Sequence, residues 1–280
     1  MAVSSPSSKF WSNAGTYALL TVVTILMLAP IYWILATSIK PTSEILVTPT
    51  HLLTGAPTLD HYGEVFAGDF KKFLVNSLIA ASGATLIGFV LSVPAAWGFA
   101  KYRYPGSGSL LSFIVVTRVF PPIALALPFF LQFRSLGLVD SPFGLVIAYL
   151  PIVLPLMIWM LTGFFRDFPD ELVEAARIDG LGVIGTLLRI VLPLSLLGLG
   201  VAVLFGFLVA WNELIIALTL TKTPASQTMP VGISTFITQF QILWGQMMAA
   251  AAIYLIPVLA VTIITQRGLV SGLMSGSSKG

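Results

Sequence analysis

The sequence predicts an all-α membrane protein with six transmembrane helices. Of its 280 residues, 57% are hydrophobic and only 9% are charged, and the mean hydropathy is +0.97. An ordinary soluble domain has about 25% charged residues, and a soluble core of this size cannot hide so much apolar surface from water. The composition therefore excludes a soluble enzyme, a nucleic-acid-binding protein and a disordered chain. Several runs without charge are also long enough to cross a bilayer.

The expected spans follow from these runs, because a helix needs about 20 apolar residues to cross the hydrocarbon core. The third span is interrupted by Arg118, and the last charge-free run, 223–266, is too long for one crossing, so only its second part is assigned. The first apolar run exceeds the core of a signal peptide, which predicts an uncleaved anchor. The six expected spans are 17–38, 73–99, 110–133, 142–165, 190–212 and 247–265. The chain 1–280 is then a single transmembrane domain.

The distribution of lysine and arginine predicts the orientation. Six crossings place both termini on one side, and cytoplasmic segments carry an excess of positive charge. With cytoplasmic termini, the inner segments carry eight Lys and Arg and the outer segments five, with Arg118 counted in neither. We therefore expect both termini in the cytoplasm.

The inner segment 166–189, between spans four and five, is expected to hold a short helix on the cytoplasmic face. Pro169 followed by Asp170 suits a helix start, where carboxylates complement the helix dipole. Gly180 is expected to end the helix, because glycine readily adopts a left-handed conformation.

Helical spacing gives this short helix two different faces. The side chains expected on the apolar side are Leu172, Val173 and Ala176. Those expected on the polar side are Glu171, Glu174 and Arg177. Small alanine side chains allow the surface of another protein to approach closely, and Glu174 offers it a charge.

The same segment resembles the EAA motif of ABC-importer permease subunits. The motif is formed by Glu174-Ala175-Ala176, then Gly180 after three residues, and Ile190 and Leu192-Pro193 after nine more. Other stretches resemble the carbohydrate-uptake permeases of the MalG type. These stretches are Phe164-Phe165 with Phe168-Pro169, Arg118 to Pro122, Trp211-Asn212-Glu213, Leu269 to Leu273 and Ser278 to Gly280. The resemblance covers the chain from about Tyr17 to its end.

The resemblance implies a type I ABC-importer permease in the plasma membrane of a bacterium or archaeon. Such a permease pairs with a second, homologous permease subunit, two cytoplasmic ATPase subunits and an extracytoplasmic substrate-binding protein. The outer segment 220–245 would contact the binding protein, and the tail 267–280 would reach the ATPase dimer. The residues implied in ATPase coupling are Glu174, Ala175, Ala176, Asp179 and Gly180.

The chain is not expected to be an enzyme or to bind a cofactor itself. It contains no G-x-x-x-x-G-K-[ST] sequence, so ATP and Mg²⁺ would be used by the partner ATPases. Its only histidines are His51 and His61, and without cysteine support they do not predict a metal site. Membrane lipid is an expected partner and nucleic acid is not.

Three polar residues are candidates for the translocation pathway. Arg118 within a span costs about 2.5 to 3.5 kcal/mol by insertion scales. It fits either a pathway residue donating to the solute, or a structural ion pair or a side chain reaching the headgroups. Glu213 lies about 35 Å along a helix from Ile190, near the outer surface. Asn212 and Glu213 fit either solute contact or a helix-terminal pair, and Arg118 is expected at a different depth.

Two classes of function follow from the sequence. The first is a permease subunit of an ATP-driven importer for a sugar, polyol or short oligosaccharide, with the solute class resting on the resemblance. The alternative is an ion-coupled secondary transporter for a small polar solute, which needs carboxylates inside the membrane and repeats with broken helices. No carboxylate lies near the middle of any expected span, which favours the importer.

Overall fold

The computed structural model describes residues 6–49, 51–102 and 104–276, with side chains described within 15–265. Secondary structure in this part of the chain is helical, apart from one isolated bridge between Ile237 and Ile242. The all-α prediction is therefore confirmed. The chain divides into two compact units, one formed by residues up to 68 with 236–253, the other by 69–235 with the residues from 254 onward. The expectation that 1–280 acts as one transmembrane domain stays a prediction.

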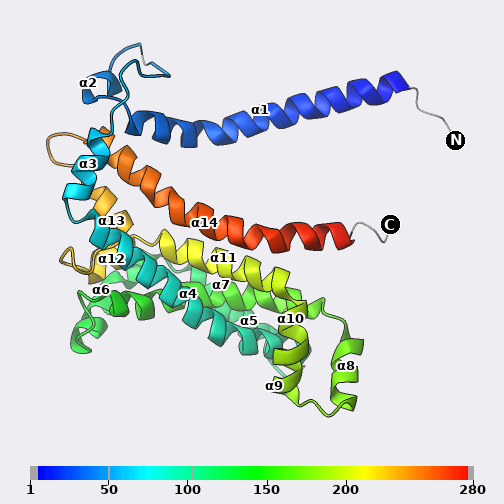
Figure 1. Cartoon of the computed structure of the whole chain (residues 1–280). Helices are drawn as coiled ribbons and strands as arrows, with labels where there is room; N and C mark the ends of the chain where they lie inside the picture. Colours follow the sequence, from blue (N-terminus) through cyan, green and yellow to red (C-terminus); the bar gives the residue numbers. More distant parts are fainter. Residues whose placement is uncertain (1–5, 50, 103, 277–280) are drawn as a thin grey trace. The chain divides into compact units, whose positions relative to one another are not determined.

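The first unit contains one long helix and two short ones (Figure 1). Helix α1, Pro6–Ser38, covers the first expected span, and α2, Thr42–Ile45, and α3, Asp60–Ala67, follow it. Helix α14, Trp244–Gly276, begins in this unit and continues into the second one. The tail prediction falls partly on residues 277–280, which lie outside the described residues.

Three helices form the centre of the second unit, namely α4, Phe70–Lys101, α7, Pro142–Arg166, and α11, Leu196–Trp211 (Figure 1). In the same unit, α12 and α13 lie at one end of these helices and α8 and α9 at the other. The remaining elements are α5, Ser107–Val116; the 3-10 turn Thr117–Val119; α6, Pro122–Ser135; α8, Asp170–Ile178; α9, Val183–Thr186; the π-helical turn Leu187–Val191; α10, Leu192–Leu194; α12, Ile215–Leu220; and α13, Met229–Ser234.

Two of the expected spans are bent instead of straight. Among the described residues, four helices are long and apolar enough to cross a membrane on their own: Gly15–Ser38, Phe70–Lys101, Pro142–Arg166 and Trp244–Thr265. Residues 107–119 and 122–135 meet at 93°, and residues 183–194 and 196–211 meet at 85°. The count of six is reached only if each bent pair is one span.

Proline accounts for the first bend, and the second lies at Ser195, two residues after Pro193. A residue before proline is driven out of the helical region, and Phe120 and Pro121 accordingly have extended ψ angles of 122° and 131°. At the second bend, Pro193 lacks an N–H to continue the ladder, and a π-helical turn precedes it. The helix restarts after Ser195, whose N–H is shared between the carbonyls of Val191 and Leu192 at 2.9 and 3.2 Å.

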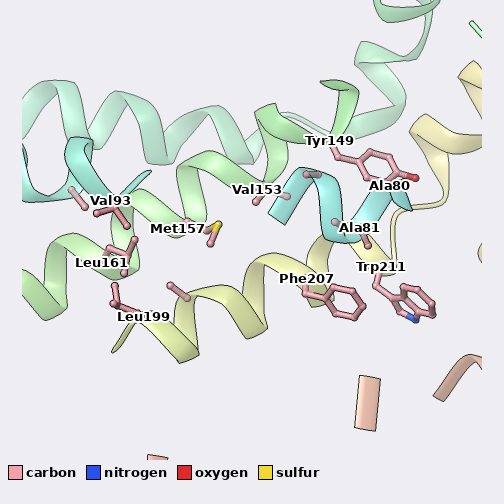
Figure 2. Close-up of a cluster of buried hydrophobic side chains, with 14 of the residues drawn as sticks. Ala80, Ala81, Val93, Tyr149, Val153, Met157, Leu161, Leu199, Phe207 and Trp211 are labelled. Atoms are coloured by element: carbon pink, nitrogen blue, oxygen red, sulfur yellow. The ribbon is translucent and has the colours of Figure 1, made fainter. Parts of the chain in front are cut away.

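Close helix packing forms the core of the second unit. In Figure 2, side chains of α4, α7 and α11 meet, including Val153 and Met157 from α7. A Cβ added to Gly88 of α4 would lie 2.8 Å from the Val153 side chain, and one added to Gly206 of α11 would lie 2.9 Å from the Met157 sulfur. Small residues at these contacts let the backbones approach closely, as they do in membrane helix pairs.

Candidate coupling helix and translocation surface

Helix α8 begins where the sequence predicts. Pro169 has φ −58° and ψ 126°, outside the helical region, and the helix runs from Asp170 to Ile178. Asp170 and Glu171 stand in its first turn, where carboxylates face the positive end of the helix dipole. Local chemistry therefore sets the start of this helix.

Its end is set by Gly180, which has φ +83° as expected. The Gly180 N–H donates to the Arg177 carbonyl at 3.0 Å, and the Leu181 N–H donates to the Ala176 carbonyl at 2.9 Å. This pair of hydrogen bonds is the Schellman motif, which satisfies carbonyls left free at a helix end. Gly180 thus turns the chain sharply after α8 without an unpaired carbonyl at those two positions.

The two faces of α8 differ in one respect from the expectation. Val173 and Ala176 are buried against the chain, whereas Leu172 is 41% exposed and therefore belongs to the surface. Glu174, Ala175 and Asp179 are exposed and free to meet a partner, while Ala176 packs inward. Of the two alanines of the motif, only Ala175 can offer a small side chain to another protein.

The structure also exposes two large apolar residues at the tip of this segment. Ile178 is 85% exposed at the end of α8, and Ile184 in α9 is 71% exposed. Exposed apolar side chains beside charged ones are typical of protein contact sites. Ile178 was not among the residues predicted from the sequence, although its position off the buried face of Val173 and Ala176 could have indicated it.

Lys101, the last residue of α4, fixes the start of α8. Its Nζ donates to the Phe168 carbonyl and to the Asp170 carboxylate, both at 2.6 Å. The Lys101 side chain is only 9% exposed. From the sequence, Lys101 contributed only to the predicted orientation, because no sequence signal joins residues 69 positions apart.

Arg118 lines a cavity at the first bend. The cavity has a volume of about 480 Å³ and lies between α5, α6 and α7. Its walls are mostly apolar and include rings from three phenylalanines, with Arg118 and Thr117 as the polar contributors. The lining residues are Phe113, Ile114, Thr117, Arg118, Phe120, Pro122, Leu125, Phe129, Pro151, Ile152, Leu154, Pro155, Ile158 and Ile216.

Asn212 and Glu213 do not line this cavity. The Asn212 Oδ1 accepts a hydrogen bond from the Tyr254 hydroxyl at 3.0 Å, and its Nδ2 donates to the Leu208 carbonyl at 2.7 Å. The Glu213 Oε1 accepts from the Ile216 N–H at 2.7 Å, which caps the start of α12. The structure therefore does not bring the three pathway candidates together, and it gives Asn212 and Glu213 helix-terminal contacts.

The histidines are placed apart from any ligand set. His61 is buried, and its Nε2 lies 2.9 Å from the Lys40 carbonyl, while His51 is exposed. The described residues contain no group of three His, Cys, Asp or Glu side chains arranged to hold a metal ion.

The segment 220–245 contains a turn with an exposed tip. Thr238 and Gln241 close the turn, because the Thr238 N–H donates to the Gln241 carbonyl at 3.0 Å and the Thr238 hydroxyl donates to it at 2.6 Å. Phe240 at this tip is 95% exposed. An aromatic side chain held on a short, hydrogen-bonded turn is suited to insertion into a partner's surface.

The family comparison decides what kind of protein this is. Residues 88–274 match the family model described as "Binding-protein-dependent transport system inner membrane component". The chain belongs to this family. As an ABC transporter permease it is a multi-pass membrane protein and not itself an enzyme, and the predicted resemblance is confirmed.

Several relatives of this permease are similar over nearly their whole length. SugB of Mycobacterium tuberculosis, a trehalose transport system permease protein, is 37% identical over 93% of this chain and 95% of its own. SmoH of Agrobacterium fabrum, a sulfoquinovosyl glycerol transport system permease protein, is 34% identical over 98% and 96%. MalG of Thermococcus litoralis, a trehalose/maltose transport system permease protein, is 34% identical over 92% and 94%.

A solved structure shows the same fold. The match is to a chain in a crystal structure of a bacterial ABC transporter involved in the import of the acidic polysaccharide alginate, with a TM-score of 0.76. The two chains are 22% identical, and the match covers 95% of this permease and 99% of that chain. This likeness confirms the importer-permease architecture predicted for the fold class.

Proposed function

We propose that this permease forms half of the translocation pathway of an ATP-driven importer for a sugar, polyol or short oligosaccharide. The relatives named for trehalose, sulfoquinovosyl glycerol and maltose support a carbohydrate as the solute. The partners are a second permease subunit, two ATPase subunits that use ATP and Mg²⁺, and a substrate-binding protein. The complex sits in a bacterial or archaeal plasma membrane with both termini of this chain in the cytoplasm.

The coupling role rests on one observation, the surface at the end of α8. Glu174, Ala175 and Asp179 are exposed there beside Ile178, and Gly180 turns the chain away so that the tip is free. A carboxylate and a large apolar side chain on one protruding helix give a partner both charge recognition and apolar burial. We assign this surface to the ATPase, with Ala176 holding α8 against its own chain.

Beside the middle of α7 we place a part of the solute's path. Arg118 is the cavity's strongest hydrogen-bond donor and serves sugar hydroxyls or carboxylates, while the phenylalanine rings pack on apolar ring faces. Asn212 and Glu213 support this path by fixing the junction of α11 and α12. The segment 220–245 receives the binding protein, with Phe240 at its exposed tip.

The test begins with gentle purification from the native host through an N-terminal tag. Recovery of a second permease and an ATPase is the expected result. Uptake into proteoliposomes should require ATP and the binding protein. Uptake by this chain alone, driven by an ion gradient without ATP, would instead establish the secondary transporter.

Variants of α8 test the coupling assignment in the same complex. Glu174→Ala should lower solute uptake at least tenfold while insertion into the membrane is unchanged, because it removes the exposed charge and leaves the buried face intact. Asp167→Ala is the matched control, since it removes an exposed carboxylate from the same inner segment just before α8. Equal uptake by Glu174→Ala and wild type would overturn the assignment.

A further inference from the structure

Asp140 closes the connection between α6 and α7 in an unusual backbone conformation. Its φ is +61°, and it is the one described residue other than glycine with a positive φ. Aspartate and asparagine tolerate this region better than other side chains. The Asp140 N–H also donates to the Leu220 carbonyl at 2.7 Å, so the backbone is tied to the end of α12.

The Asp140 carboxylate receives four hydrogen bonds from one short segment, 222–226. Its Oδ1 accepts from the Lys222 N–H at 2.8 Å and the Thr223 N–H at 2.9 Å, and from the Ser226 hydroxyl. Its Oδ2 accepts from the Thr223 hydroxyl at 2.8 Å. A carboxylate has about four acceptor sites, and here four donors of one segment bind it, three of them at Oδ1.

These bonds also keep the carboxylate charged. Burial by itself raises the pKa of Asp140, but the hydrogen bonds from Ser226, Lys222 and Thr223 outweigh that effect and hold the pKa below its usual value. Hydrogen bonds to an ionised acceptor are stronger than those between neutral groups. The segment is therefore attached to Asp140 by charge-assisted bonds at neutral pH.

Helix α4 holds the next residues of the same segment. The Asn76 Nδ2 donates to the Gln227 carbonyl at 2.9 Å, and the Ser77 hydroxyl accepts from the Met229 N–H at 2.7 Å. The chain from 222 to 229 is thus fixed from two sides. Its outward surface is nevertheless free, because Lys222 and Thr223 are exposed.

The attachment orients one exposed cation. The Lys222 ammonium lies 5.4 Å from the centre of the Phe130 ring, which restrains a side chain that is otherwise flexible. Ordering such a side chain in advance lowers the entropic cost of binding a partner. No ion pair of the Lys222 ammonium occurs among the described residues, so this exposed cation remains available to a carboxylate of a partner.

We propose that Asp140 is a positioning residue that holds Lys222 and Thr223 in place to dock an acidic patch of the substrate-binding protein. The inference rests on the proposed importer function and adds to it the residue that shapes the docking surface and the charge of the partner. Asp140 acts through the segment and does not itself touch the partner.

The test uses the complete importer in proteoliposomes, with initial uptake measured against the concentration of ligand-loaded binding protein. Asp140→Asn keeps a side chain that accepts positive φ but replaces one acceptor oxygen by a donor group. We expect the half-saturating binding-protein concentration to rise about tenfold, with the maximal rate within about twofold of wild type. Asp69→Asn is the control, because it removes an exposed carboxylate that pairs with Lys72 at 2.7 Å.

Two further variants separate positioning from simple stability. Removing the donors with Thr223→Val and Ser226→Ala should give a similar shift that is not additive with Asp140→Asn, since all three break one cluster. Lys222→Met should raise the half-saturating concentration and weaken its dependence on salt. A lower melting temperature with an unchanged half-saturating concentration would overturn the proposal. Absence of ATP-dependent uptake by the wild-type importer would instead refute the proposed function on which it rests.

Discussion

Lys101→Met removes the contact that joins α4 to the start of α8, the helix that we propose contacts the ATPase. The substitution keeps much of the apolar stem but removes the ammonium that donates to the Phe168 carbonyl and the Asp170 carboxylate. The stem of a lysine packs like a hydrophobic chain, so loss of the charge is the main change. The helix α8 should then be held less firmly against α4.

The size of the effect follows from the exposure of the two acceptors. A hydrogen bond between a charged and a neutral group contributes about 1.5 to 3 kcal/mol, and Phe168 is buried. Asp170 is exposed, so its ion pair adds only about 0 to 1 kcal/mol. A net loss of about 2 kcal/mol corresponds to a roughly 30-fold weaker preference for the fixed position of α8.

The assay is the number of ATP molecules hydrolysed per solute imported by the reconstituted importer. We expect this ratio to rise several-fold in Lys101→Met, because under the proposed coupling a movement of α8 by the ATPase would be passed on less firmly to α4. Lys72→Met is the matched control, since Lys72 has an ion pair of similar length at 2.7 Å but is exposed. A wild-type ratio in Lys101→Met would refute the reasoning.

Two further predictions concern packing and pH. Gly206→Leu should lower the melting temperature in detergent and reduce the free energy of unfolding by about 1 to 3 kcal/mol, because its Cβ alone would meet the Met157 sulfur at 2.9 Å. Gly163→Leu is the control and should have little effect, because a Cβ at Gly163 has nothing within 4 Å. Because the pKa of Asp140 is lowered in the folded protein, its carboxylate should contribute fully to the free energy of unfolding above about pH 5. This contribution should be lost as the pH falls below about 4, the usual pKa of aspartate. Melting temperatures of wild type and Asp140→Asn should therefore converge only in acid, and convergence at neutral pH would contradict the prediction.

Local signals in the sequence predicted the bounds of helix α8 well. Pro169 and the carboxylates after it mark the start of α8, and Gly180 marks its end through a left-handed φ that no neighbour has to impose. The charge-free runs likewise predicted the long helices α4 and α7, because a membrane span depends mainly on composition.

Other features depend on partners far along the chain and could not be predicted in this way. Lys101 and Asp140 both find their hydrogen-bond partners more than 60 residues away, so only the folded chain shows their roles. The bends of 93° and 85° also depend on the packing of the flanking helices, which the sequence alone does not show. Leu172 shows the same limit, because its exposure depends on what the rest of the chain leaves uncovered.

The bend at Ser195 is a point about which helix α11 could rotate relative to residues 183–194. This helix, Leu196–Trp211, has 16 residues. It is therefore about 24 Å long, so a turn of about 10° at the bend swings its far end by about 4 Å. Residues 183–194 and 196–211 meet at 85°. A displacement along the axis of the first would therefore move the second sideways. Force applied at the α8 end would therefore reach the core as lateral sliding across the glycine contacts, and not as compression along the helix axis.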